Sequence, residues 1–389
     1  MCQDTVGPTT SECAMLEPQM RTWKLVGGVV FGVLSWTVGC GELATTVSAD
    51  AGVEAACGVV CAPGQEPCAG TCTLGRCLVT LASVGATQRP YAIALDAMNV
   101  YWTDNPPIPE GAVMSVPIGG GVSTTLASNQ TDPTGIAVSD TSVYWTSPSN
   151  VMKIPLKGGT LETLAGGAPS KNLGTPTLGI ALDTTSVYWT SADPPNVQKA
   201  PIGGGAPTTL ASGGLPFSSI AVDSTNVYWL ALANDKTTTG MVLKAPLHGG
   251  SPTTLASGQG EPWNLAVDAT NVYWTDALAG TVLKAPLDGG TPTTLGSRSP
   301  DCPPSSMVGA ASLTGLAIDA TSVYWTDYGC GTVMRAPLDG GEPVTLASTA
   351  TVDRAIGVSE LAQPNDIVVD AKSAYWTDEN GWVLKLTPK

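Results

Sequence analysis

The chain has 389 residues, with 32 acidic and 17 basic side chains, a net charge of −15 and only 13% charged residues. A strongly acidic chain is a poor match for the phosphate backbone of nucleic acid, so the composition excludes nucleic acid as an expected partner. The length alone would suit two or three domains, but an internal repeat, described below, indicates one large domain.

The first 39 residues have the pattern of an export signal. Residues 1–19 carry acidic but no basic side chains, whereas Met20 opens a short basic stretch that leads into an apolar run, Leu25–Gly39. That run is shorter than the ~20 apolar residues of a membrane span. We therefore predict a signal peptide over residues 1–39, with Met20 as the true start of translation.

Cys40 directly follows the apolar run, in the sequence Thr-Val-Gly-Cys. This tetrapeptide resembles a bacterial lipobox, in which the cysteine is acylated and becomes the mature N-terminus. It predicts a lipoprotein of the bacterial outer membrane or cell surface, which touches the membrane only through its anchor at Cys40. Plain secretion to the periplasm or medium, and an uncleaved anchor, are the alternatives.

Residues 40–77 form a separate segment. Its first part is rich in small and polar residues and predicts a flexible tether. Five cysteines follow, at Cys57, Cys61, Cys68, Cys72 and Cys77. Their spacing would allow a zinc site, but an oxidising compartment and the lack of a nearby histidine favour disulfides, of unassigned connectivity.

From there on, a Tyr-Trp pair marks every repeat. The pairs begin at Tyr101, Tyr144, Tyr188, Tyr228, Tyr273, Tyr324 and Tyr375. Successive tyrosines lie between 40 residues (Tyr188 to Tyr228) and 51 residues (Tyr324 to Tyr375) apart. A period of about 40–50 residues with four strand-like runs is typical of a β-propeller blade.

The clearest unit predicts four strands, at Leu265–Asp268, Val272–Asp276, Thr281–Leu287 and Pro292–Ser297. Because side chains alternate along a strand, Val272 and Trp274 should point one way and Tyr273 and Thr275 the other. Both sets are bulky, so each blade should pack against a neighbour on both of its faces.

The number and order of the runs predict how the ring closes. Seven first-strand runs and seven fourth-strand runs exist, but Leu78–Ser83, a fourth-strand run, precedes every first strand. The last unit ends after its third strand. The strand 78–83 should therefore complete the last blade, which gives an all-β, seven-bladed β-propeller of four-stranded blades over residues 78–389.

The motif resembles the YWTD repeat of the low-density lipoprotein receptor family. The complete Tyr-Trp-Thr-Asp motif occurs four times, at Tyr101–Asp104, Tyr273–Asp276, Tyr324–Asp327 and Tyr375–Asp378. Rings of that family have six blades and flanking EGF-like modules, so this chain departs from it. Its general architecture is similar to bacterial NHL-type and streptogramin-lyase-like propellers. The resemblance implies a scaffold that binds protein or ligand on one face, and no catalytic residues carry over.

Few residues suggest catalysis. The single histidine, His248, falls in a predicted glycine turn between third and fourth strands, on the face opposite the long loops. Streptogramin-lyase-like propellers rely on a histidine near the axis, so this placement argues against that reaction. The expected ring at the start of the first strands contains Tyr91, Thr134, Ser218, Asn264, Thr314 and Asn365–Asp366. Of these, only Asn264, Asn365 and Asp366 offer suitable oxygens for calcium, which prefers six or more. We therefore expect neither a cofactor nor a metal, with calcium at the channel mouth as the alternative.

The long insertions fall in connections that emerge on one face of the ring, the long-loop face. They are Asn105–Gly111, Ala231–Gly240, Ser299–Ser312 and Ser348–Pro364. Variable loops on a rigid scaffold commonly carry binding residues. The candidates on this face are Trp263, Asn264, Tyr328, Asp353, Arg354, Asn365, Asp366 and Trp382. Cys302 and Cys330 lie in two of its connections, so we predict a disulfide between them.

The sequence thus predicts an exported, surface-anchored and monomeric binding scaffold for a protein, peptide or glycan, rather than an enzyme. A metal-dependent propeller lyase or lactonase is one alternative. A structural protein of the cell envelope is another.

Overall fold

A computed structural model describes residues 70–73, 76–85, 87–106, 110–148, 150–166, 179–192, 195–212, 215–232, 239–299, 302, 313–349, 352 and 363–389. The predicted signal peptide and Cys40 lie outside these residues. Within them, no helix has the length and apolar character that a membrane span requires.

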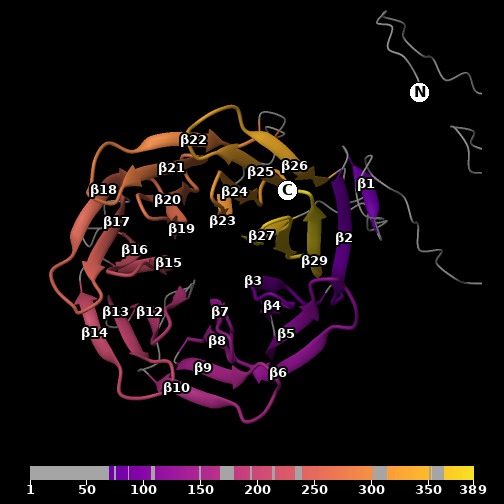
Figure 1. The fold of residues 1–389 in the computed structure, drawn as a ribbon, viewed down its shortest axis with the longest axis horizontal. Helices are drawn as coiled ribbons and strands as arrows, with labels where there is room; N and C mark the ends of the chain where they lie inside the picture. The colour runs from indigo at the N-terminus through magenta and orange to yellow at the C-terminus, as the bar shows by residue number, and fades with distance from the viewer. Residues whose placement is uncertain are drawn as a thin grey trace, which may run out of the picture. The chain divides into compact units, whose positions relative to one another are not determined.

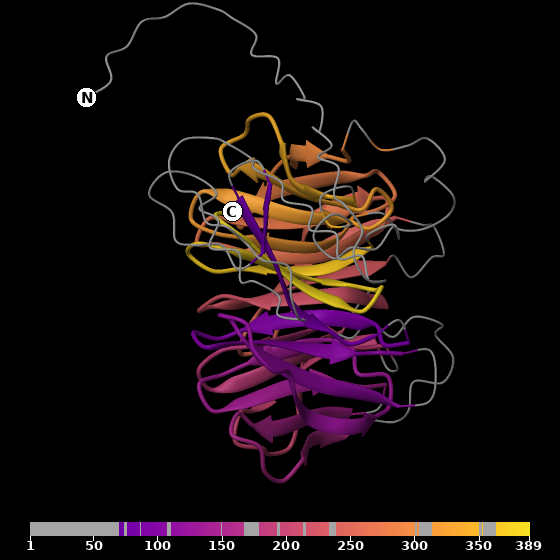
Figure 2. The ribbon, with the colours of Figure 1, turned by 90° about the vertical axis from the view of Figure 1, so that its right-hand side faces the viewer.

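Seven antiparallel sheets stand around a central axis as the blades of a propeller, as the sequence predicts (Figure 1). Figure 2 shows the same ring edge-on. In each blade the first strand lies innermost. In blades 1 to 6 the chain then moves outward strand by strand, whereas the outer strands of blade 7 come from the beginning of the propeller.

The strands of blades 1 to 4 have the following bounds. Blade 1 contains β3 (Pro90–Leu95), β4 (Asn99–Asp104), β5 (Gly111–Pro117) and β6 (Thr124–Gln130). Blade 2 contains β7 (Ile136–Val138), β8 (Ser142–Thr146), β9 (Asn150–Pro155) and β10 (Glu162–Gly166). Blade 3 contains β11 (Ile180–Leu182), β12 (Ser186–Ala192), β13 (Pro195–Pro201) and β14 (Thr208–Ser212). Blade 4 contains β15 (Leu215–Val222), β16 (Asn226–Leu232), β17 (Gly240–Pro246) and β18 (Thr253–Gln259).

Blades 5 to 7 follow the same order. Blade 5 contains β19 (Pro262–Val267), β20 (Asn271–Asp276), β21 (Thr281–Pro286) and β22 (Thr293–Ser297). Blade 6 contains β23 (Leu313–Ile318), β24 (Ser322–Asp327), β25 (Thr332–Pro337) and β26 (Val344–Ser348). Blade 7 contains β27 (Pro364–Val369), β28 (Ala374–Asp378), β29 (Trp382–Thr387), β2 (Arg76–Ser83) and β1 (Thr71–Thr73).

Blade 7 confirms the predicted closure of the ring. Strand β2 pairs with β29, with Leu78 opposite Leu386. The sheet has one strand more than the sequence predicts, because β1 forms a hairpin with β2 and places Cys72 opposite Cys77. Strand pairing therefore begins inside the cysteine-rich part of the segment 40–77.

The Tyr-Trp pair makes the contact between neighbouring blades. Tyr228 of blade 4 and Trp274 of blade 5 lie in one buried cluster, and Tyr273 of blade 5 lies with Trp325 of blade 6 in the next. Each of the seven clusters holds one such tyrosine and the tryptophan of the following blade. Alternation along the second strand thus explains why both residues are large: each fills a different side of its blade.

An aspartate at the end of the first strand fixes the turn to the second. In blade 5, Asp268 Oδ1 accepts hydrogen bonds from the backbone N–H of Thr270 and Asn271, and its Oδ2 accepts one from the Tyr273 hydroxyl at 2.7 Å. The same Tyr–Asp bond occurs in six blades. In blade 2, where Ser139 replaces the aspartate, the Tyr144 hydroxyl instead donates to the Ile202 carbonyl.

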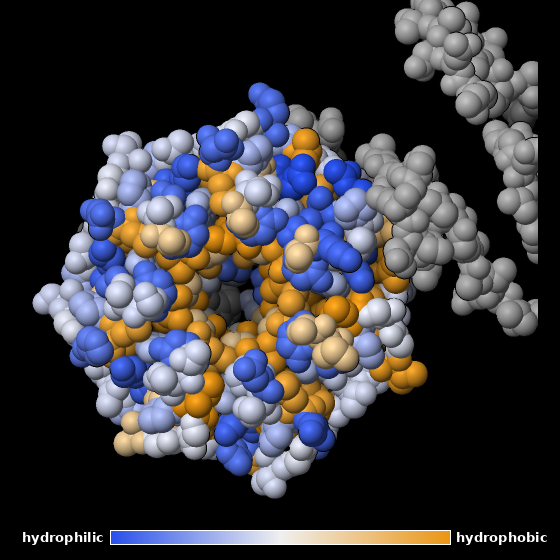
Figure 3. Space-filling model, in the orientation of Figure 1, coloured by the Kyte–Doolittle hydropathy of each residue, from blue (hydrophilic) through white to orange (hydrophobic). Residues whose placement is uncertain are grey.

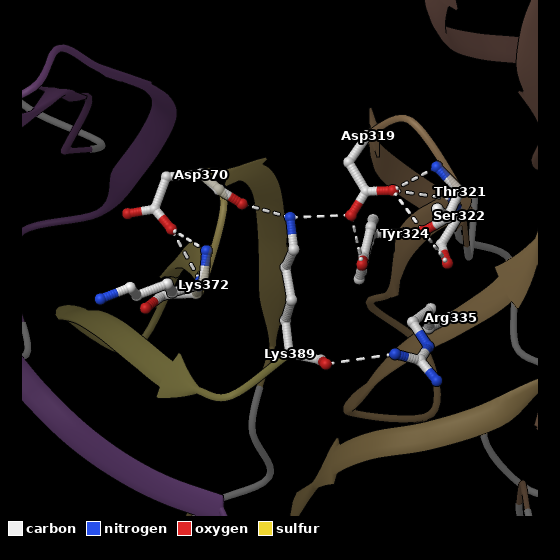
Figure 4. Close-up of polar contacts among 9 residues, drawn as sticks. Asp319, Thr321, Ser322, Tyr324, Arg335, Asp370, Lys372 and Lys389 are labelled. Atoms are coloured by element: carbon white, nitrogen blue, oxygen red, sulfur yellow. Dashed lines mark hydrogen bonds and ion pairs between the residues drawn. The ribbon is translucent and has the colours of Figure 1, made fainter. Parts of the chain in front are cut away.

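Basic residues of the third strands donate hydrogen bonds to the next blade, on the face that carries these short turns. Lys244 donates to the Leu287 carbonyl at 2.5 Å, and Lys284 donates to that of Leu338. In the same way Arg335 of blade 6 donates to the carbonyl oxygen of Lys389 in blade 7, so Lys389 takes the place of the accepting leucine (Figure 4). Its ammonium group also pairs with Asp319 at 2.8 Å.

Candidate functional site

The candidate site lies in the central channel, at the starts of the seven first strands. All seven blades line a cavity of about 220 Å³ there. The opposite end of each first strand, by contrast, leads into a short turn to the second strand. Figure 3 shows one face of the ring, hollowed at its centre, with apolar residues around the opening and hydrophilic residues farther out.

A β-bulge turns two successive residues of a first strand toward the channel. In β19, Pro262 pairs with Asp276 but Leu265 pairs with Trp274, so one extra residue stands between the two pairs. Strands β3, β23 and β27 carry the same irregularity. A bulge re-aims side chains locally, and here it produces two stacked rings.

We call the two rings the mouth ring and the inner ring. The described residues of the mouth ring that line the cavity are Tyr91, Thr134, Trp263, Thr314 and Asn365. Those of the inner ring are Ala92, Gly135, Gly179, Ser219, Asn264 and Asp366. The mouth ring carries its aromatic and amide side chains on blades 5, 7 and 1, and the inner ring carries its amide and carboxylate on blades 5 and 7.

This register corrects one prediction. The sequence places Asn264 in the same ring as Tyr91, whereas strand pairing makes Trp263 the counterpart of Tyr91 and Asn264 the counterpart of Asp366. The prediction was wrong by one residue because an ideal strand sends only alternate side chains into the channel, and the bulge breaks that alternation.

A chain of hydrogen bonds orders the inner ring. The Ser219 hydroxyl donates to Asn264 Oδ1 at 3.0 Å, which turns the amide so that Asn264 Nδ2 donates to Asp366 Oδ1 at 3.3 Å. Asp366 also accepts from the backbone N–H groups of Ile93 and Ile367, at 3.1 and 2.9 Å. The carboxylate is therefore held by contacts from blades 1, 5 and 7.

These surroundings shift the acidities of two channel groups. Burial raises the pKa of Asp366 to about 6, although its three hydrogen bonds oppose the shift. Burial also raises the pKa of Tyr91, and the nearby charges of Asp366 and Glu379 add to that shift. The Tyr91 phenol is therefore neutral at pH 7, whereas Asp366 loses its proton closer to neutral pH than an exposed aspartate does.

Asn365 is a buried polar residue at the mouth. The residue is only 8% exposed, and its Nδ2 has no hydrogen-bond partner among the described residues. Its backbone is fixed, because its carbonyl oxygen accepts from the hydroxyls of Thr314 and Thr326, both at 2.7 Å. A buried amide nitrogen without a partner is costly, and Asn365 is one of the residues that line the cavity.

The other candidates of the long-loop face have different surroundings. The Tyr328 hydroxyl donates to Glu379 at 2.9 Å, between the residues that follow the second strands of blades 6 and 7. Trp382 does not line the channel: it lies in β29 and packs half-buried against the cluster between blades 6 and 7. Trp382 stands at the start of a third strand, two strands away from the innermost one, and therefore does not reach the channel. Asp353 and Arg354 lie outside the described residues.

The structure contains the disulfide between Cys302 and Cys330, with an S–S distance of 1.97 Å. Arg298 lies beside it and forms an ion pair with the buried Asp327 at 3.4 Å. The bond thus joins two connections of the long-loop face around one buried charge pair.

The described residues offer little to a metal ion. Cys302, Asp327 and Cys330 come within 4.8 Å of one another, but both sulfur atoms are already in the disulfide. In the cavity, Asp366 is the only carboxylate among the described lining residues. One carboxylate and two amides do not fit the six or more oxygen ligands that calcium takes.

Two further residues complete the site description. His248 is exposed in the turn after β17, on the face opposite the mouth. Ser219, which orients Asn264, is a functional residue that the sequence analysis missed. Aligning Ser219-Ile220 with Asn264-Leu265 would have found it, because Ile220 and Leu265 pair with the tryptophans of their second strands, Trp229 and Trp274.

The solved structures similar to this chain are propellers. A catalytically inactive histidine-to-alanine variant of virginiamycin B lyase from Staphylococcus aureus, with quinupristin, has a TM-score of 0.62 at 14% identity, over 80% of this chain and 99% of that chain. A streptogramin B lyase has a TM-score of 0.59 at 13% identity, over 81% and 98%. The extracellular domain of a hybrid two-component system from B. thetaiotaomicron has a TM-score of 0.56 at 11% identity, over 79% and 39%.

At these identities the likeness shows the fold alone. No protein-family model matches the sequence, and no curated protein matches it. The chain is a seven-bladed β-propeller, and the resemblance to YWTD repeats rests on its sequence motifs.

Proposed function

We propose that this protein is a binding module, exported and anchored at the bacterial cell surface through Cys40, that holds a protein, peptide or glycan at its channel mouth. One observation carries the proposal: the side chains that differ between blades gather at one end of the channel. There Trp263, Asn264, Asn365 and Asp366 line one cavity together with Tyr91.

Three of those residues suit recognition. The indole of Trp263 and the phenol of Tyr91 supply apolar faces with polar tips, and Asp366 is held in place by three hydrogen bonds. A few oriented polar groups among larger apolar ones are typical of ligand sites.

A lyase reaction finds less support. Virginiamycin B lyase shares the fold, and the inactive variant lacks a histidine. The one histidine of this chain, His248, lies exposed on the opposite face. A reaction that depended on histidine would need that side chain within hydrogen-bond reach of the substrate.

The proposal can be tested by probing a peptide array and a glycan array with the full chain and two variants. Trp263→Ala removes the largest mouth side chain, and His248→Ala is the control on the opposite face. We expect specific capture by the wild type and His248→Ala, and at least a tenfold loss for Trp263→Ala. Capture that is unchanged by Trp263→Ala, or no capture at all, would contradict the proposal.

A further inference from the structure

The hydrogen-bonding groups left over at the mouth restrict the chemistry of the ligand. Asn365 Nδ2 is a donor without a partner, in a residue that is nine-tenths buried and lines the cavity. Asp366 is an acceptor with capacity remaining, because a carboxylate has about four lone-pair sites and this one receives three hydrogen bonds. A matching ligand must accept from the first group and donate to the second.

Two common neutral groups can do both, the hydroxyl and the amide. A hydroxyl donates one hydrogen bond and accepts two. An ammonium or guanidinium group only donates, so it would leave Asn365 Nδ2 unpartnered. A carboxylate or phosphate only accepts, and it would lie against the charge of Asp366, which has no cationic partner among the described residues.

The aromatic residues favour the hydroxyl over the amide. Trp263 and Tyr91 belong to blades 5 and 1, on either side of blade 7, which supplies both Asn365 and Asp366. Their rings offer apolar surface beside the polar pair. A molecule with hydroxyls on its edge and C–H groups on its faces satisfies both kinds of surface at once.

The volume limits the size of this molecule. Ligand pockets usually enclose about 300–1,000 Å³, whereas the cavity here is about 220 Å³. It has room for about seven water molecules at about 30 Å³ each. That space suits one sugar ring and not an oligosaccharide.

We propose that the channel mouth binds a single neutral sugar ring, the end of a glycan whose remainder lies on the long-loop face. A ring hydroxyl accepts from Asn365 Nδ2, a hydroxyl donates to Asp366, and the ring contacts Trp263. This inference rests on the proposed binding function and names its ligand class.

Isothermal titration calorimetry of the full chain tests the inference. The probes are the methyl glycosides of glucose, galactose, mannose and N-acetylglucosamine, with Nα-acetyl-lysine amide and Nα-acetyl-arginine amide as cationic comparisons. We expect at least one neutral glycoside to bind and both cationic amides to fail.

Two variants locate the site. Asn365→Asp preserves the size of the side chain but removes its N–H donors, and we expect about tenfold weaker glycoside binding. Trp263→Ala should also weaken binding by tenfold or more. The control is Asn271→Asp, the same exchange at the turn face, which should bind as the wild type does.

The outcomes separate this inference from the proposed function. Binding of a cationic amide that Asn365→Asp strengthens would overturn the sugar assignment in favour of a basic peptide. Failure of every neutral glycoside, with peptide capture that still depends on Trp263, would overturn the inference and leave the binding function standing. If no probe or array ligand depended on Trp263, both would fall.

Discussion

The two ends of the seven first strands differ in how strictly they repeat. At the turn end, six blades finish in an aspartate that accepts the tyrosine hydroxyl, and only Ser139 departs from the pattern. At the mouth end, the corresponding positions hold Tyr91, Thr134, Trp263, Thr314 and Asn365. Repeat proteins are stabilised mainly by contacts between neighbouring units, so the repeated end is scaffold and the varied end is free to carry function.

A pair of tryptophan exchanges should show this difference most strongly. Trp274 is fully buried between blades 4 and 5, and its indole N–H donates to Gln259 at 3.0 Å. We expect Trp274→Ala to lower the free energy of unfolding by about 3–5 kcal/mol. Trp263→Ala, at the mouth, should lower it by about 1 kcal/mol or less. Urea unfolding measures both, and equal losses would erase the distinction between scaffold and site.

The carboxylates of the two faces should respond to pH in opposite directions. Burial raises the pKa of Asp104 and Asp378, at the long-loop face, to about 6, although backbone hydrogen bonds oppose the shift. Asp268, in a turn, is partly buried too, but hydrogen bonds from Tyr273, Thr270 and Asn271 outweigh that effect and lower its pKa. An unfolded aspartate titrates near 3.9.

The direction in which stability changes with pH follows from the difference between the folded and unfolded pKa values. A raised pKa stabilises the fold below about pH 4, and this contribution is lost as the pH rises through about 6; a lowered pKa stabilises the fold above about pH 4 and is lost on further acidification. Asp104→Asn should therefore remove about 1–3 kcal/mol of the stability change between pH 4 and 6. Asp268→Asn should alter only the change below pH 4. Urea midpoints across pH 3–7 measure both, and an unaltered pH 4–6 slope in Asp104→Asn would refute the assignment.

The smallest expected difference in stability is between the third-strand lysine of blade 2 and that of another blade, both at the turn face. Lys244→Met removes a hydrogen bond to the next blade, and we expect a loss of about 1 kcal/mol. Lys153 of blade 2 instead forms an ion pair with the exposed Glu162 at 3.8 Å. Such pairs contribute little, so Lys153→Met should cost less than about 0.5 kcal/mol. Thermal unfolding of both variants would contradict this contact pattern if Lys153→Met proved the more damaging.

The sequence predicts most of the scaffold, because the scaffold is what repeats. The alternation of Tyr273 and Trp274 predicts two packed faces, and the early fourth strand at Leu78–Ser83 predicts ring closure. Both predictions are confirmed. The strand β1 was missed because one short hairpin strand has no repeat to reveal it.

The sequence predicts the site less completely. Trp263, Asn264, Asn365 and Asp366 line the channel cavity, but their order in two rings depends on a bulge that leaves no mark in composition. Trp382 begins β29 and packs against the cluster between blades 6 and 7, so it is not among the described residues that line the cavity, and its part in binding stays a prediction. The orphaned nitrogen of Asn365 depends on three-dimensional packing and could only be found in the structure.

The central claim is that the ligand occupies the mouth of the channel. A crystal structure of the full chain with the strongest ligand from the arrays tests it most directly. Our account predicts ligand density between Trp263 and Asn365, with an acceptor atom within hydrogen-bond distance of Asn365 Nδ2. Ligand density on the turn face, near His248, with no ligand at the mouth would contradict it.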